Sequence, residues 1–537
     1  MRSLVETHDR VKDFDWEPSY STPVEHYPTK YKIPGKTRDP FRHLVRDYLS
    51  MEQEKDDRQY GGLEDALARS GAPAKADMGW MEVMKLALPI VSYAEYGALK
   101  CQAQLSDTVE NPELRQGYLF QMQDEIRHIN QQLYLARYFA RHAPDPEGFN
   151  NGMKVRNSNI FFRAGRSCFE TFFNGDPIEC SLSLQVVGET AYTNPLFVAL
   201  TEVAALNGDQ ATPSVFLSIQ SDESRHMANG YATLAAVLSE AENHEFLQAD
   251  LDRVFWRNHV FLDPLLATVY DYFGKERTSS YHEKWTEWVA EDWVGSYIGR
   301  LEPYGLKPPR WFDQAVARSP HLGHASAMTA AAAWPFMFWR FPQLNDADFE
   351  WFEEKYPGWN NDHGTFWQVY QTLCHPAEGM FPFQLLAERP PICQLCHMPC
   401  VYPKIDETTL RTAGYNGSLY PFCSEACEFI FFEEPERYLS ATPFDVLWDG
   451  VGIDEFIIKN GLLRSDGKTL IAQPHCDPEL PMWTIDDIAR TGFAVEDPLK
   501  ERKAEYRKAH AAGLVGDGRI DVKAIPSMNG SMNGVKA

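Results

Sequence analysis

The sequence has few features that would suit binding to a polyanion or crossing a membrane. Its 537 residues include 51 Lys or Arg against 76 Asp or Glu, a formal net charge of −25, which argues against nucleic acid or an anionic membrane as the main partner. The longest apolar run, AMTAAAAWPFMFW, is shorter than the ~20 residues that span a bilayer. The opening MRSLVETHDRVKDF is too polar for a signal peptide. We therefore expect a soluble cytoplasmic protein.

Cysteine is scarce as well, with ten residues in the chain. In the cytoplasm, metal binding is favoured over disulfides for such residues. Apolar residues make up 44% of the chain and aromatic residues 13%, enough to bury a large core. The length predicts one large domain with additions.

Most of the middle of the chain has a helical pattern. Long apolar segments that are poor in Gly and Pro, such as WMEVMKLALPIVSYAEYGALKCQAQL and PLFVALTEVAALNG, predict helices from about residue 80 to 300. Breakers fall at ENPE (110–113) and NGDQATPS (207–214). Upstream, PFRHLVRDYLSMEQEKDD predicts a short helix after an extended arm.

One five-residue pattern, Asp-Glu-x-Arg-His, occurs twice, ending at His128 and at His226. A lone Glu-x-x-His arises easily by chance, but two copies with the same flanking Asp and Arg do not. On a helix, this spacing puts Glu and His on one face. Each copy follows a further Glu in an apolar context, Glu95 in PIVSYAEYGAL and Glu189 in LSLQVVGETAY, with a breaker in between.

Each unit therefore predicts a helical hairpin with a Glu on one arm and Glu-x-x-His on the other. Several buried carboxylates would repel one another unless a cation lies between them. Four Glu and two His from four helices are the known ligand set of di-iron or di-manganese carboxylate bundles. The predicted ligands are Glu95, Glu125, His128, Glu189, Glu223 and His226. The alternative is a set of surface carboxylates and hydrogen-bonded histidines.

Two further pairs lie beside the predicted ligands. Asp124 and Asp222 each precede a ligand Glu, and we expect them to orient the histidines as hydrogen-bond acceptors. Arg127 and Arg225 would then be their charge partners. Solvated ion pairs at the surface are the alternative.

The C-terminal third contains a C-x2-C and C-x3-C set at CQLC and FCSEAC. Four thiolates at this spacing suit a tetrahedral structural zinc site, formed by Cys393, Cys396, Cys423 and Cys427. The alternative is a group of buried free thiols. Cys400 is left over, and we expect the remaining cysteines to be packing residues: Cys101, Cys168, Cys180, Cys374 and Cys476.

With these motifs, the chain resembles the hydroxylase α-subunit of soluble bacterial multicomponent di-iron monooxygenases. GETAYTNPLFVALTEVAALNGD, VFLSIQSDESRHMANGY, FEWFEEKYPGW and LRSDGKTLIAQPH are similar to the methane and alkene enzymes of that family. The resemblance implies one iron held by Glu95, Glu125 and His128, and a second by Glu189, Glu223 and His226, with Glu125 bridging them. YPFCSEACEFIFFEEPERY resembles a treble-clef zinc knuckle, which the phenol enzyme has and the methane enzyme lacks.

The resemblance also implies roles for residues near the irons. Thr193 and the ligand Glu223 would take part in catalysis, with Thr193 assisting proton delivery, unless its hydroxyl only bonds its own helix backbone. Asn194 matches a position where the small coupling protein docks. Gln132 departs from the cysteine of the methane enzyme and matches the aromatic-oxidising branch, and Phe197 replaces a smaller residue. The implied cavity positions, which core packing alone could also explain, are Val91, Ala94, Ala98, Gln132, Phe172, Leu184, Thr193 and Phe197.

We thus predict a mainly α fold, with a ferritin-like di-iron four-helix bundle inside a larger helical domain and a small C-terminal zinc knuckle. The predicted function is oxygenase: activation of O2 and insertion of one oxygen atom into small hydrocarbons, by alkene epoxidation or short-chain alkane hydroxylation. The alternatives are an aromatic hydroxylase of the same family, an acyl-chain desaturase, an iron-storage protein and a catalytically silent subunit. The predicted segments are an arm and helix (1–75), the di-iron domain (76–340), a helical and loop extension (341–390), the knuckle (391–440), an α/β segment (441–500) and a flexible tail (501–537).

The expected cofactors are two non-haem irons and a structural zinc. No Gly-rich nucleotide fingerprint or ferredoxin-type cysteine set is visible, so NADH, FAD and a 2Fe-2S cluster would act through a separate reductase. The family implies further partners besides O2 and a small hydrocarbon: a hydroxylase β-subunit, a small coupling protein and an (αβ)2 assembly.

Overall fold

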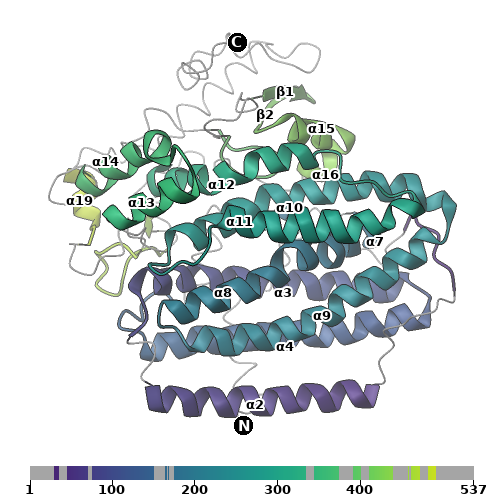
Figure 1. Ribbon diagram of the computed structural model, residues 1–537, viewed down its shortest axis with the longest axis horizontal. Helices are drawn as coiled ribbons and strands as arrows, with labels where there is room; N and C mark the ends of the chain where they lie inside the picture. Colours follow the sequence, from purple (N-terminus) through teal and green to yellow (C-terminus); the bar gives the residue numbers. More distant parts are fainter. Residues whose placement is uncertain are drawn as a thin grey trace. The chain divides into compact units, whose positions relative to one another are not determined.

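The computed structural model describes most of the chain, and Figure 1 gives its helices and strands. The described residues are 29–35, 45–70, 75–149, 162, 164–165, 167–168, 175–333, 344–373, 391–400, 411–439, 457–458, 461–471 and 482–490. Phe172, Cys374, Cys476 and the predicted tail (501–537) therefore lie outside them. The chain divides into two compact units. One comprises Met1–Met153, Cys168–Leu262 and Gly274–Val316, and the other Lys154–Ser167, Asp263–Phe273 and Ala317–Ala537.

The first unit contains the two predicted hairpins. Helix α3 (Met78–Thr108) and helix α4 (Pro112–His142) form the first. Asn111 accepts hydrogen bonds from the backbone N–H groups of Glu113 and Leu114, and Pro112 follows it, so the ENPE breaker caps the start of α4. The second hairpin consists of η2 (Leu182–Thr193), α8 (Asn194–Leu206) and α9 (Ala211–Leu238).

The two hairpins pack against each other through α4 and α9, which run alongside one another (Figure 1). Asp209 joins their ends. Its carboxylate accepts from the N–H groups of Ala211 and Thr212 at the start of α9, and from the Trp80 indole at the start of α3, 2.8 Å away. Trp80 is completely buried. The two hairpins thus share one apolar core. Four helical segments surround the middle of this core.

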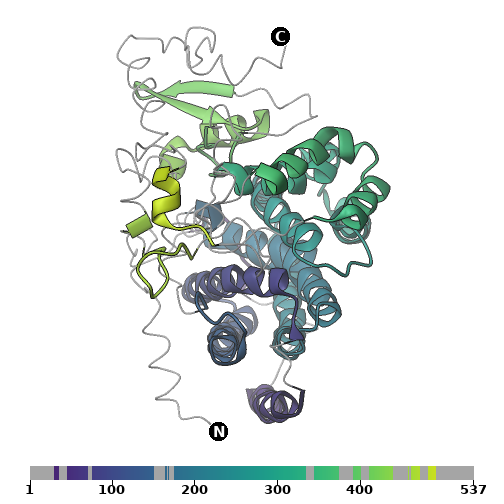
Figure 2. The same ribbon diagram turned by 90° about the vertical axis from the view of Figure 1, so that its left-hand side faces the viewer.

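Helix α2 (Val45–Ser70) packs on this bundle against α9. It is the purple helix seen nearly end-on in Figure 2. It is longer than the short helix expected over 40–57, because Gly61 and Gly62 do not end it. Leu63, which follows them, is buried, and Tyr48 stacks on Phe120 of α4 with ring centroids 4.5 Å apart. Burial of this face offsets the low helix propensity of glycine.

The rest of the first unit supports the hairpins. It contains α7 (Pro177–Ser181), the 3-10 helix η3 (Ala241–Asn243), most of α10 (His244–Tyr272), α11 (Tyr281–Trp285), a second π-helix η4 (Thr286–Ile298) and the 3-10 helix η5 (Gly299–Tyr304). Residues 29–35 are tied to this unit because Lys30 and Tyr31 both bond Asp250 of α10.

The second unit combines helices with a small cysteine-rich segment. Its helices are most of α12 (Phe312–Ala333), then α13 (Asp346–Lys355), the π-helix η6 (Asn360–Gly364) and α14 (Thr365–Leu373), with α19 (Ile485–Arg490) near the end of the described chain. Strands β1 (Arg411–Tyr415) and β2 (Ser418–Phe422) pair antiparallel, with Arg411 opposite Phe422. Helices α15 (Glu425–Glu433) and α16 (Pro435–Leu439) follow. Among the described residues, no helix is long and apolar enough to cross a membrane.

Candidate metal centres

The structure brings together all six side chains that the sequence predicts as iron ligands. They come from four helical segments, and their exposed fractions lie between 0% and 7%. They are Glu95 of α3, Glu125 and His128 of α4, Glu189 of η2, and Glu223 and His226 of α9.

Both imidazoles point one nitrogen at the carboxylates. Nδ1 of His128 lies 3.3 Å from Glu125 and 3.6 Å from Glu223. Nδ1 of His226 lies 3.2 Å from the other oxygen of Glu223 and 3.6 Å from the other oxygen of Glu125. Each of these two carboxylates therefore has one oxygen directed toward each histidine.

The donor atoms form two groups, and each group is compact enough for one metal ion. One consists of Glu95, Glu125 and His128, and the other of Glu125, Glu189 and His226. Glu125 belongs to both. Two ions bound here would therefore share the Glu125 carboxylate, and Glu223 would lie between them.

Electrostatics in this cluster favour a cation. Burial raises the pKa of Glu125 to about 8. Burial and the charge of Glu223 raise the pKa of Glu189 well above its ordinary value. Burial lowers the pKa of His226, but the charges of Glu223 and Glu125 outweigh burial and raise it overall. Without a metal, the cluster must take up protons, whereas bound cations would neutralise it.

The hydrogen bonding of the cluster also fits metal binding. Oε2 of Glu125, Oε2 of Glu189 and Nδ1 of His128 are buried and make no well-formed hydrogen bond within the described part of the chain. Carboxylate oxygens and imidazole nitrogens are the ligands that iron and manganese take in such bundles.

Each copy of the sequence motif supplies the aspartate that contacts the histidine of the other copy. Nε2 of His128 lies 3.1 Å from Asp222, which belongs to the other motif, and Nε2 of His226 lies 3.2 Å from Asp124. The arginines also reach across: Arg127 bonds Asp222 at 2.8 Å, and Arg225 bonds both Asp124 and Asp222 of its own motif at 2.9 Å. An imidazole that donates one N–H to a carboxylate is fixed in orientation with its other nitrogen free for a metal.

Helix α2 adds charged and polar groups that the sequence reasoning missed. Tyr48 donates to Asp124 at 2.8 Å, Glu52 bonds both Arg127 and Arg225, and Lys55 bonds Asp222. Their spacing along the chain places all three on one helix face. That spacing was the available signal, but a helix this polar reads as a solvated surface helix.

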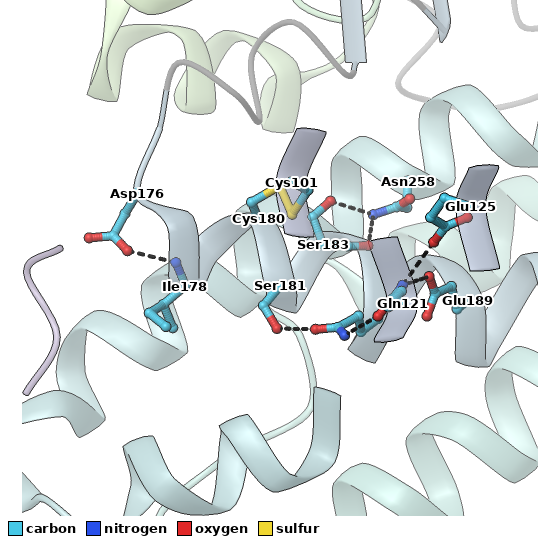
Figure 3. Close-up of a disulfide and its surroundings, with 11 residues drawn as sticks. Cys101, Gln121, Glu125, Asp176, Ile178, Cys180, Ser181, Ser183, Glu189 and Asn258 are labelled. Atoms are coloured by element: carbon cyan, nitrogen blue, oxygen red, sulfur yellow. Dashed lines mark hydrogen bonds between the residues drawn. A yellow bond between two sulfur atoms is a disulfide. The ribbon is translucent and has the colours of Figure 1, made fainter. Parts of the chain in front are cut away.

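Two glutamines of α4 donate to the predicted ligands. The Gln132 amide lies 2.6 Å from Oε1 of Glu95. The Gln121 amide lies 3.0 Å from Oε1 of Glu125 and 3.0 Å from Oε1 of Glu189 (Figure 3). Gln121 was not predicted. It precedes Glu125 by one helical turn, and that spacing is its only trace in the sequence.

Glu189 lies in a π-helix, whose i→i+5 hydrogen bonds are rare and often mark functional sites. Side chains support its wider backbone. The Thr190 hydroxyl donates to the Gln185 carbonyl, five residues before it, at 2.9 Å. The Trp293 indole of η4 donates to the Val186 carbonyl at 2.8 Å. These donors satisfy carbonyls in η2 and fix the segment that carries Glu189.

The remaining predicted site residues lie on the same helices. Thr193 ends η2, four residues after Glu189, and is half-buried, while Asn194 begins α8. Phe197 is buried and packs on Phe216 of α9, with ring centroids 5.2 Å apart. The other described cavity positions are Val91, Ala94 and Ala98 of α3, Gln132 of α4 and Leu184 of η2.

The four predicted zinc ligands also come together. The sulfurs of Cys393, Cys396, Cys423 and Cys427 form one buried group, with Cys423 3.7 Å from Cys396 and 3.5 Å from Cys427. The first pair lies in a turn that is bonded to the β-hairpin through the Gln394 N–H and the Pro421 carbonyl, 2.9 Å apart. Cys427 lies in the first turn of α15, which Ser424 caps.

One prediction about cysteine is wrong. Cys101 of α3 and Cys180 of α7 were expected to be packing residues, but their sulfurs are bonded (Figure 3). Their Cα atoms lie 6.4 Å apart, within the range that a disulfide spans. The two cysteines are 79 residues apart in the sequence, and only the packing of α7 on α3 makes them neighbours.

The fold and the buried set of four carboxylates and two imidazoles define the class: a ferritin-like helical protein with a carboxylate-rich di-metal site. Residues 16–241 match the family model described as methane/phenol/alkene hydroxylase. The chain is 37% identical to the methane monooxygenase component A alpha chain of Methylococcus capsulatus, over 92% of this chain and 94% of that protein. It is 36% identical to the propane 2-monooxygenase hydroxylase large subunit of a Gordonia species, over 96% and 98%.

The structural comparison agrees. The phenol hydroxylase of Pseudomonas sp. OX1 matches with a TM-score of 0.72 and 25% identity, covering 82% of this chain and 90% of that one. The chain belongs to the methane/phenol/alkene hydroxylase family of di-iron monooxygenases. It is an oxidoreductase, the large hydroxylase subunit of a multicomponent monooxygenase, as the resemblance implied.

Proposed function

We propose that the six converging residues hold two iron ions, and that the subunit oxidises short-chain alkenes or alkanes. The observation that carries this proposal is the pair of donor groups that share Glu125, each with one imidazole nitrogen directed inward. The relatives named for methane and propane support a small apolar substrate. In the reaction, one atom of O2 enters the hydrocarbon, and the other leaves as water after taking up two electrons and two protons.

The irons would supply the O2 chemistry, which no protein side chain can perform. The residues of the chain have other tasks. Asp222 and Asp124 hold the imidazoles in one orientation through their Nε2 atoms. Apolar side chains that are buried on the same helices, such as Ala98 and Phe197, would keep water away from the site. Thr193, four residues after Glu189 on η2, would supply a hydroxyl that passes protons inward.

Other components would complete the reaction. Electrons would come from NADH through a reductase with FAD and a 2Fe-2S cluster. A β-subunit and a small coupling protein would bind the chain in an (αβ)2 assembly, with Asn194 at the coupling-protein site. The cytoplasm, where NADH is available, would be the location.

We also propose a structural zinc at the four-cysteine group. A treble-clef arrangement supports this, since one cysteine pair lies in a turn and the other where a hairpin leads into helix α15. Burial raises the pKa values of Cys393, Cys396 and Cys427 well above the ordinary thiol value, while hydrogen bonds from the neighbouring cysteines lower the pKa of Cys423. Zinc would therefore displace the remaining thiol protons when it binds. The metal would join segments that form only a two-stranded sheet and short helices.

Metal analysis and turnover test the proposal together. The chain, coexpressed with its partner subunits, should contain about two irons and one zinc per chain, and with reductase it should oxidise propene or propane. A His128→Ala, His226→Ala double variant should lose iron and keep zinc, while Cys393→Ser, Cys423→Ser should lose zinc. Wild-type protein that is folded but free of iron would refute the oxygenase assignment.

Aromatic hydroxylation is the second candidate, favoured by one observation. The amide nitrogen of Gln132 donates a hydrogen bond to Glu95. The amide oxygen of Gln132 is buried and has no hydrogen-bond partner in the described part of the chain. That oxygen could accept a hydrogen bond from a phenolic hydroxyl. Competition between propene and phenol in one assay would discriminate between the two candidates. A Gln132→Cys variant should shift the preference toward propene.

A further inference from the structure

A line of three buried polar side chains ends on the predicted iron ligands. It begins at Ser181 of α7, whose hydroxyl donates to the amide oxygen of Gln185. The amide nitrogen of Gln185 donates to the amide oxygen of Gln121 at 2.6 Å. The amide nitrogen of Gln121 then reaches Glu125 and Glu189, each at 3.0 Å (Figure 3). None of the three is more than 1% exposed.

The direction of this line is determined by its chemistry. A carboxylate that binds a metal ion is ionised and can only accept hydrogen bonds, so with metal bound Gln121 must turn its NH2 group toward Glu125 and Glu189. Its oxygen then needs a donor, which Gln185 provides. The oxygen of Gln185 needs a donor in turn, and the Ser181 hydroxyl supplies it. A flip of any one amide would set two acceptors against each other.

The packing holds this line in place. Gly230 of α9 lies against Gln185 so closely that a Cβ atom at position 230 would be 2.5 Å from the Gln185 Cβ. Gln185 therefore has its backbone fixed by α9 and its side chain fixed by hydrogen bonds at both ends. It precedes Glu189 by four residues on the π-helix, so it shares that helix's departure from α geometry.

Gln121 is the only described side chain whose amide nitrogen bonds ligands from both hairpins, α4 on one side and η2 on the other. We propose that Gln121 is a positioning residue that links Glu125 to Glu189 and sets the geometry of the metal position at Glu189 and His226. Gln185 and Ser181 keep its amide in the donating orientation. This inference rests on the proposed di-iron function.

The test compares two glutamines of the same helix. Gln121→Met removes both donated hydrogen bonds while nearly preserving the volume. Gln131→Met is the matched control, because Gln131 is equally buried on α4 but bonds Gln59 of α2 at 2.7 Å. We expect Gln121→Met to bind the second iron about 10–100-fold more weakly. The Mössbauer spectrum should change for one of the two irons, while Gln131→Met should keep the wild-type spectrum.

A second pair of variants tests the orientation of the line. Ser181→Ala removes the first donor and should shift the same iron signal by a smaller amount, while Ser181→Thr keeps the hydroxyl and should restore it. If Gln121→Met and Gln131→Met lose stability equally and leave the iron spectrum and affinity unchanged, Gln121 only packs. If the wild-type protein itself binds no iron, the proposed function fails first. Circular dichroism establishes that each variant is folded.

Discussion

The two hairpins carry the same Asp-Glu-x-Arg-His motif, yet they surround their metal positions differently. In the first, Glu95 lies on a regular α-helix and receives one short hydrogen bond from Gln132. In the second, Glu189 lies on a π-helix and shares the Gln121 amide with Glu125. A repeated motif thus places equivalent ligands, while the neighbouring segments make the two metal positions unequal.

The pKa values of Glu95 and Glu189 also differ between the two hairpins. Burial raises the pKa of Glu95, but hydrogen bonding from His128 and Gln132 outweighs burial and brings it below its ordinary value. At Glu189, burial and the charge of Glu223 act together and raise the pKa. In the metal-free protein Glu95 is therefore ionised and Glu189 is protonated. The first position should accept a metal more readily.

The strongest test of this comparison removes the aspartate behind each histidine. Asp222 is fully buried and contacts His128, Lys55, Arg127 and Arg225. Asp222→Asn therefore removes a carboxylate from the buried His128 and from three half-buried cations, which keep Glu52 as a partner. Loss of one partner from a buried ion pair costs about 3–5 kcal/mol, and loss of a carboxylate behind a metal-binding histidine costs about 10–100-fold in affinity. Iron titration and chemical unfolding should both show large losses.

Asp124→Asn should have the smaller effect of the two. Asp124 has one close cationic partner, Arg225 at 2.9 Å, while Arg127 is farther away at 3.6 Å. Its third partner, Tyr48, is a neutral hydrogen-bond donor. Asp56→Asn serves as the control, since Asp56 bonds Arg127 at 2.8 Å but is partly exposed. Equal losses for all three variants would contradict the crossed arrangement.

That crossed arrangement marks the limit of the sequence reasoning. The spacing of Glu125 and His128 predicts a shared helix face because helix geometry is local, and the breakers predict the hairpins for the same reason. Which aspartate meets which histidine depends on how α4 and α9 pack, and spacing carries no such information. The partnership of Asp124 with histidine was predicted, but the identity of its partner was not.

The other omissions have similar causes. The segment LSLQVVGETAYT has an ordinary apolar helix pattern, and its π-helix is supported by donors such as Trp293 from far along the chain. Tyr48, Glu52 and Lys55 lie on a helix that looks solvated until α4 and α9 cover one face of it. The four cysteines were predictable, because zinc ligands occur at short, regular spacings.

A pH titration of iron binding sharpens the contrast between the two positions. The raised pKa values at Glu125 and Glu189 mean that the metal-free protein holds protons there that its unfolded chain releases. This contribution to the stability of the metal-free protein is fully present below the ordinary glutamate pKa of 4.5. It is lost as the pH rises through the pKa of about 8 that Glu125 has in the folded protein. Iron must displace the same protons.

We therefore expect iron affinity at the second position to rise with pH, by up to about tenfold per pH unit for each proton released. The first position should change less, because Glu95 is already ionised and protons must leave only the shared Glu125 and His128. Titrations between about pH 6 and pH 8, followed by optical and Mössbauer spectra, would separate the two. Filling of both positions with the same pH dependence would show that they are equivalent.

The smallest expected effect comes from two glycines at the helix contacts. A Cβ at Gly230 would lie 2.5 Å from the Gln185 Cβ and 3.4 Å from its backbone carbon, so Gly230→Ala must push η2 away from α9. A Cβ at Gly117 of α4 would instead meet the Asn229 side-chain oxygen at 2.2 Å, and that side chain can rotate. Overpacking of the first kind costs about 1–3 kcal/mol.

Gly230→Ala should therefore lower the free energy of unfolding more than Gly117→Ala, and it alone should weaken the second iron, by a few-fold. Urea unfolding and iron titration of both variants would measure this. The reason is that Gly230 contacts Gln185, which holds the Gln121 amide that bonds Glu189. Gly117, by contrast, borders only the contact between α4 and α9. A larger loss of iron in Gly117→Ala would mean that the metal site depends on that helix contact, and that the π-helix is a passive neighbour.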